Sequence, residues 1–131
     1  MGSGWSIALG LAGLGNLANG LWMLADPAHW YLNLPAAVPD FGPLNEHFVR
    51  DIGCAFTLIG GLLLAAIVRP AWRLPACAVA AGFYGLHAGV HVLDTARGLV
   101  GPEHWGIDLP AVYVPAALFA LLAAFAARRP A

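Results

Sequence analysis

The stretch CAFTLIGGLLLAAIV, residues 54–68, is almost entirely apolar and carries no charge, and this makes it the strongest indication of the fold. It belongs to an apolar window at about His47–Val68, and a helix needs about 20 apolar residues to cross a bilayer. Similar windows lie at about Trp5–Leu24, Leu74–Thr95 and Pro110–Ala127. Only helices and closed barrels satisfy the backbone in hydrocarbon, and these windows lack the polar alternation of barrel strands. The sequence therefore predicts an all-α fold, an integral membrane four-helix bundle.

The composition agrees with a chain whose solvent is lipid. Of its 131 residues, 60% are hydrophobic and 10% are charged, whereas about a quarter of a soluble domain is charged. The length suits a single domain over residues 1–131. A net charge of −1 without a basic tract argues against nucleic acid as a partner. We expect the lipid bilayer as the partner, and the apolar helices also permit a homo-oligomer.

The placement of arginines predicts the orientation of the spans. Arg69 and Arg73 lie between the second and third windows, and Arg128 and Arg129 follow the fourth. An even number of spans puts both places on the side of the N-terminus, and the positive-inside rule makes this side cytoplasmic. We therefore expect a multi-pass protein with both termini in the cytoplasm. The outer loops are then residues 25–46 and 96–109.

The two halves of the chain resemble one another. Gly10–Ala36 aligns without a gap with Gly85–Ala111, and its clearest match pairs Pro27, His29 and Trp30 with Pro102, His104 and Trp105. Two interfacial turns that converged on similar chemistry would explain part of this match. A duplicated helix–loop unit explains more, so the sequence predicts a pseudo-repeat of two helix–loop units within the bundle.

Polar side chains inside the predicted spans are candidates for a functional site, because ionisable groups are expensive in a membrane. His87 and His91 lie four residues apart on one helix face, and His47 and Asp51 have the same spacing on the second span. His47 is expected at the outer end of its span with Asp51 about 6 Å below it, and His91 and His87 are expected about 6 Å and about 12 Å below the same surface, at 1.5 Å of rise per residue. We therefore expect one pocket in the outer leaflet. It would be formed by Asn16, Asn19, His47, Arg50, Asp51, Tyr84, His87, His91 and Asp94.

The spacing favours a metal or haem site in this pocket. Two imidazoles one helical turn apart can hold one ion, and a histidine–carboxylate pair on a facing helix supplies further ligands. Histidine with carboxylate suits zinc, iron or copper, and histidines from two helices suit haem. The expected metal ligands are His47, Asp51, His87 and His91. Such a centre would permit redox chemistry, and the sequence assigns no catalytic residue.

Two other functions are compatible with the same residues. Histidine titrates near neutrality, so a chain of histidine, aspartate and arginine suits a proton-linked small-molecule binder or transporter. The polar residues would otherwise satisfy one another across the helices, in a structural subunit of a membrane assembly.

The remaining polar and small residues are expected to have structural roles. His29 and His104, on the outer loops, are interpreted as solvated interfacial side chains; as matching positions of the repeat, they are also compatible with a lid or a secondary metal site. The glycines of the spans are expected to let helices pack closely; they include Gly13, Gly60, Gly61, Gly82 and Gly85.

The stretch DPAHWYLNLPAAVPDFGPLNEHFVRDIG, residues 26–53, resembles a recurrent pattern in small four-span bacterial membrane proteins of uncharacterised function. These proteins are in turn similar to DoxX-like proteins. The run from Asn45 to Gly53 is the most distinctive part of the match. The resemblance implies a four-helix bundle in the bacterial inner membrane, and it implies no catalytic residue.

Overall fold

The computed structural model describes residues 3–128; residues 1–2 and 129–131, and with them Arg129, lie outside the described part. Within residues 3–128 all regular structure is helical, which confirms the predicted all-α fold. Four helices in this range are long and apolar enough to cross a membrane. They are Gly4–Ala25, Glu46–Val68, Pro70–Ala96 and Leu109–Arg128, and they agree with the predicted spans to within a few residues.

The spans are built on four long helices: α1 (Ser3–Ala25), α3 (Glu46–Val68), α4 (Arg73–Ala96) and α6 (Val114–Arg128). The shorter elements are α2 (Pro27–Asn33), η1 (Val38–Phe41), η2 (Pro70–Trp72), α5 (His104–Ile107) and η3 (Leu109–Tyr113). Large apolar side chains cover the outside of the long helices: Leu11, Leu58 and Leu86 are 72%, 74% and 78% exposed. Such a surface suits lipid rather than water.

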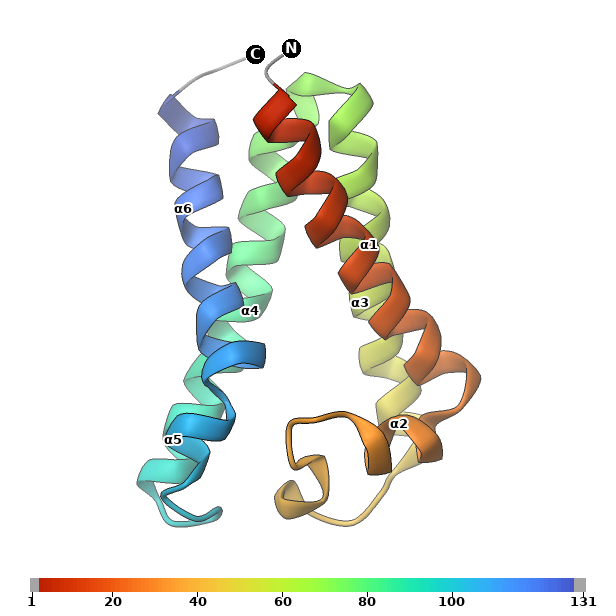
Figure 1. The fold of residues 1–131 in the computed structure, drawn as a ribbon, viewed down its shortest axis with the longest axis vertical. Helices are drawn as coiled ribbons and strands as arrows, with labels where there is room; N and C mark the ends of the chain where they lie inside the picture. The colour runs from red at the N-terminus through yellow and green to blue at the C-terminus, as the bar shows by residue number, and fades with distance from the viewer. Residues whose placement is uncertain (1–2, 129–131) are drawn as a thin grey trace.

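The long helices are arranged as two pairs. Helix α1 packs along α3, helix α4 packs along α6, and a sparser α3–α4 contact joins the two pairs. In Figure 1 the pairs meet near the chain termini and diverge toward the opposite end, where α2 and α5 lie. We call these the terminal end and the polar end. Each pair consists of two consecutive spans, as in the predicted helix–loop units; an origin by duplication stays a prediction.

Glycines bring α1 and α3 into close contact. A Cβ atom added at Gly20 would lie 2.6 Å from the backbone nitrogen of Thr57, and one added at Gly60 would lie 2.6 Å from that of Leu17. No side chain fits at these distances, so the two backbones touch directly. This close approach fixes the rotation of α3: Gly53 and Gly60 face α1, and the residues on the opposite face of α3 turn away from it.

The main core lies where the two pairs meet. Leu63, Cys77 and Ala80 are fully buried there, together with Leu9 from α1 and Phe119 from α6. A smaller core at the polar end consists of Met23 from α1, Trp30 from α2 and Val49 from α3. Both cysteines of the chain, Cys54 and Cys77, are free.

The loop between α1 and α3 is held against its own pair and also reaches the other one. Asp26 caps α2 by accepting a hydrogen bond from the backbone N–H of His29 at 3.0 Å. Ala37 and Gly42 have positive φ angles of 47° and 129°, and these two residues flank η1. The resulting turns place Asp40 at the second pair, where it contacts a histidine that follows α4.

Candidate functional site

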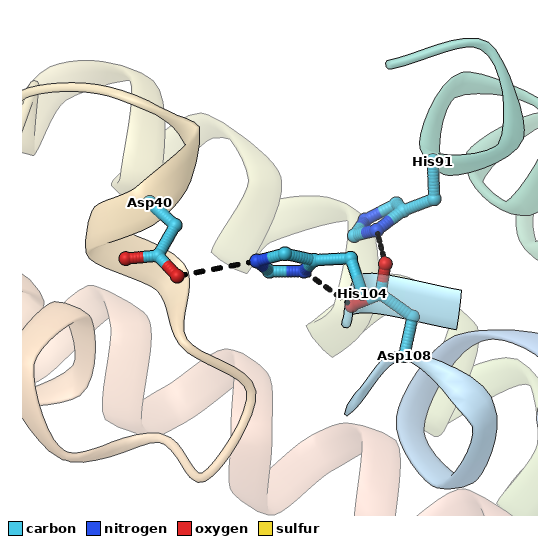
Figure 2. A network of polar contacts seen from close by, with 4 residues as sticks. All are labelled: Asp40, His91, His104 and Asp108. Carbon is cyan, nitrogen blue, oxygen red and sulfur yellow. Dashed lines mark hydrogen bonds and ion pairs between the residues drawn. The ribbon is translucent and has the colours of Figure 1, made fainter. Parts of the chain in front are cut away.

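Four side chains at the polar end form a continuous hydrogen-bonded chain, drawn in Figure 2. Asp40 Oδ2 lies 3.2 Å from His104 Nε2, and His104 Nδ1 lies 3.3 Å from Asp108 Oδ1. The other oxygen of that carboxylate, Asp108 Oδ2, lies 2.7 Å from His91 Nδ1. We call these four residues the His–Asp chain. It joins η1 of the first helix pair to α4 and α5 of the second.

The local fold explains why His104 and Asp108 face the same way. The backbone N–H of Asp108, the C-cap of α5, donates to the carbonyl of His104 at 3.1 Å, so the two residues lie one helical turn apart. The helix then widens into η3, where the carbonyl of Asp108 accepts from the N–H groups of both Val112 and Tyr113. Asp108 is therefore fixed at the junction between α5 and the last span.

Burial changes sharply along the His–Asp chain. The Asp40 side chain is 54% exposed, His104 and Asp108 are both 0% exposed, and the His91 side chain is 13% exposed. A buried carboxylate is costly unless it is paired and hydrogen-bonded, and both oxygens of Asp108 have an imidazole partner. The chain thus leads from an accessible carboxylate, through two enclosed groups, to a histidine of the third span.

The geometry of His104 requires an extra proton. A neutral imidazole has one N–H group, and an ionised carboxylate only accepts hydrogen bonds. Both ring nitrogens of His104 face carboxylate oxygens. The two contacts can be hydrogen bonds together only if the imidazole is doubly protonated or if Asp40 or Asp108 carries the proton. The His–Asp chain is therefore arranged to hold one proton that can sit at more than one atom.

The surroundings favour the charged form of His104. Burial alone would lower the pKa of its imidazole, but the hydrogen bonds to Asp40 and Asp108 and the charges of these carboxylates outweigh burial. As a result the pKa of His104 is raised above its ordinary value of 6.5. This residue lies outside the four spans, between the third and the fourth.

Aromatic rings cover the His–Asp chain and extend it into the bundle. The ring of Phe41 packs edge-on against His91 and His104, with centroids 4.7 Å and 4.8 Å apart. His87 packs against His91 from the next turn of α4, at 4.6 Å, and then stacks on Phe83. Phe41 thus covers the His–Asp chain on the side of the loop. His87 packs against the other end of the chain, on the third span.

The structure brings together only part of the predicted pocket. His87 and His91 are neighbours on α4, as their spacing predicts. His47 and Asp51 pair with each other at 3.5 Å, and their side chains are 88% and 60% exposed. Arg50 pairs with Glu46 at 3.0 Å instead of with a carboxylate of the pocket. In residues 3–128 no three His, Cys, Asp or Glu side chains are placed to hold a metal ion, so the predicted metal site has no geometric support.

The other residues of the predicted pocket form links between helices. The Tyr84 hydroxyl donates to Asn16 Oδ1 at 3.1 Å, which joins α4 to α1. Trp30 Nε1 donates to Asn19 Oδ1 at 2.8 Å, which joins α2 to α1. Asp94 is half-buried near the end of α4, outside the His–Asp chain. Both asparagines thus have satisfied, structural hydrogen bonds.

The interpretation of His104 as a solvated side chain is wrong, because the residue is fully buried beneath Phe41. Its counterpart in the predicted repeat, His29, is exposed and accepts a hydrogen bond from Trp22 Nε1 at 3.1 Å. His104 and Asp108 are four residues apart, as are His47 and Asp51, so the sequence could have predicted that the two side chains lie on one helix face. No sequence pattern could have predicted the contact of His104 with Asp40, because Asp40 lies far away in the sequence.

Comparisons of this chain with protein-family models, with curated proteins and with solved structures find no match.

Proposed function

We propose that this protein is a proton-linked binder or transporter of a small molecule in the membrane, with the His–Asp chain as its proton-carrying group. One observation carries the proposal: His104 lies between two carboxylates and can receive a proton at one ring nitrogen while it releases one at the other. Imidazole does this near neutral pH. Hydrogen-bonded chains of ionisable side chains within membrane proteins commonly serve as proton relays.

The order of burial gives the relay a direction. Asp40 exchanges protons with water, because half of its side chain is exposed. A proton then passes through His104 to Asp108, and from there to Nδ1 of His91, over heavy-atom distances of 2.7–3.3 Å. Nε2 of His91 takes no part in these contacts, so it is the ring atom free to release the proton into the bundle, where His87 packs against the His91 ring.

The same chain links the two helix pairs at the polar end. Asp40 and Phe41 belong to the loop of the first pair, whereas His91, His104 and Asp108 belong to the second. Loss of the shared proton leaves His104 with one N–H group for two carboxylates, which breaks one link. Deprotonation therefore favours separation of the pairs where they already diverge in Figure 1, and protonation favours their closure. This coupling is what a proton-linked carrier needs.

The orientation follows from the charges at the terminal end. Arg69 lies there between α3 and α4, Arg73 begins α4, and Arg128 ends α6. The positive-inside rule makes this end cytoplasmic. The polar end then faces the outside, and protons enter from there. With the bacterial resemblance of residues 26–53, this indicates the inner membrane.

A metal or haem site is the weaker proposal. It needs His47 and Asp51 to converge with His87 and His91, whereas the first two residues pair with each other on an exposed face. Elemental analysis and the absorption spectrum of the purified protein test it directly.

Liposomes that contain the purified protein and an internal pH-sensitive dye test the relay. Because the small molecule is unidentified, the assay measures the uncoupled movement of protons through the relay: a potassium diffusion potential, negative inside, should drive proton uptake in wild-type vesicles. Asp108→Asn should abolish the uptake, because it removes the buried carboxylate that connects the two histidines. His47→Gln is the matched control, since that residue pairs only with Asp51, and it should retain uptake. Equal uptake by Asp108→Asn and wild type would overturn the proposal.

A further inference from the structure

A second feature lies at the terminal end, away from the His–Asp chain. An open groove of about 420 Å³ is lined by Gly4, Trp5 and Ala8 of α1 and by Leu122 and Phe125 of α6. The backbones of α1 and α6 do not approach each other along the described residues, so no helix contact closes this groove. Its volume falls within the range of small-molecule sites, about 300–1,000 Å³, and its lining is apolar.

A cation lies beside the groove. The guanidinium carbon of Arg73 is 5.6 Å from the centre of the Trp5 ring, one of the walls of the groove. The Nε and Nη2 atoms of Arg73 are buried and have no hydrogen-bond partner among the described residues. Buried charged donors without an acceptor are strongly unfavourable. By contrast, Arg50 at the polar end has Glu46 as its partner.

These two observations together specify the chemistry of an occupant. An apolar groove accepts an acyl chain, and an anion would supply the hydrogen-bond acceptor that Nε and Nη2 of Arg73 lack among the described residues. We propose that this groove binds an anionic phospholipid from the leaflet at the terminal end, with its phosphate on Arg73 and one acyl chain along Trp5. Guanidinium groups bind phosphate through paired, charge-assisted hydrogen bonds. Basic sites near the cytoplasmic ends of spans recognise lipid head groups in the same way.

Retention of lipid by the full-length protein tests this site. The purified protein is delipidated in mild detergent, titrated with phosphatidylglycerol or phosphatidylcholine, and analysed by native mass spectrometry. Wild-type protein should retain one phosphatidylglycerol in preference to phosphatidylcholine. Arg73→Gln should weaken phosphatidylglycerol binding by at least about tenfold, the loss expected when one partner of a desolvated charge pair is removed, and it should leave phosphatidylcholine binding unchanged. Arg69→Gln is the matched control, because Arg69 lies over Trp72 in the same turn, and it should bind as wild type does.

A second variant separates the groove from the charge. Ala8→Phe should fill the groove and reduce retention of both lipids, while the helical circular dichroism of the protein stays intact. Equal binding of the two lipids by wild type, or unchanged phosphatidylglycerol binding by Arg73→Gln, would overturn the proposal. The outcome is independent of the proton relay, which lies at the other end of the bundle.

Discussion

His91 Nδ1 lies 2.7 Å from Asp108 Oδ2, and this contact fixes the third span to the start of the fourth. It is the shortest contact of the His–Asp chain, and Asp108 is fully buried. A neutral substitute for Asp108 therefore affects both the stability of the α4–α6 pair and the path of the proton.

Asp108→Asn should lower the free energy of unfolding by about 1–3 kcal/mol, the usual effect of leaving a buried polar group without its partner. One oxygen becomes an amide NH₂ group, which cannot accept a hydrogen bond from an imidazole N–H. Thermal unfolding in detergent, followed by circular dichroism, measures the change. Asp94→Asn is the control, because Asp94 lies half-buried outside the chain, and its effect should be clearly smaller. Equal effects of the two substitutions would contradict this prediction.

Stability should fall as the pH rises above neutrality, because His104 has a raised pKa in the folded protein. The group binds a proton more tightly in the folded state than in the unfolded state, so folding is favoured wherever that proton is bound. This contribution is complete below pH about 6.5, the ordinary pKa of histidine, and is lost as the pH passes the raised pKa.

Unfolding temperatures between pH 6 and 9 test this assignment. His104→Gln should make the unfolding temperature nearly independent of pH over this range. His29→Gln, which changes an exposed histidine, should leave the pH dependence as in the wild type. If the unfolding temperature of His104→Gln fell with pH as steeply as that of the wild type, the pH dependence would belong to another group.

The spans were predictable from the sequence because the bilayer requires about 20 consecutive apolar residues, whatever the tertiary packing. The contact between His87 and His91 was predictable for a similar reason, since residues one helical turn apart meet on one face. Both predictions depend on local geometry alone.

The partners of these histidines were not predictable, because they depend on how the helices rotate against each other. The close glycine contact with α1 turns Gly53 and Gly60 inward, and it leaves His47 and Asp51 on the exposed face of α3. The contact between Asp40 and His104 joins two loops that are far apart in the sequence. Its formation requires turns with positive φ at Ala37 and Gly42, and hydropathy carries no information on such turns.

The polar end should open when the link between Asp40 and His104 is lost. Spin labels at Leu32 on α2 and at Leu99 beyond α4, both exposed positions, report the separation of the two pairs by pulsed electron resonance. The labels are attached to single cysteines in a variant in which Cys54 and Cys77 are alanine. Wild-type protein should show a longer or broader distance distribution at pH 9 than at pH 6.

Asp40→Asn should give the open distribution at both pH values, because the amide cannot replace the carboxylate charge opposite His104. Glu46→Gln is the control: Glu46 is an exposed carboxylate of the same helix pair that contacts Arg50, and its loss should leave the pH response intact. If Asp40→Asn kept the wild-type response, the link would have no part in closing the polar end.

The α1–α3 pair offers a matched test at two neighbouring glycines. Both were expected to let helices pack closely, but only Gly60 has that position: a Cβ atom there would lie 2.8 Å from the carbonyl of Gly13, whereas one at Gly61 meets nothing within 4 Å. Gly60→Ala should therefore push the helices apart and destabilise the protein by about 1–3 kcal/mol, the cost of overpacking. Gly61→Ala should be neutral or stabilising by up to about 1 kcal/mol, since alanine is the better helix former. The unfolding temperatures of the two variants test this prediction. If Gly60→Ala left the unfolding temperature unchanged, α1 and α3 would not touch at this glycine.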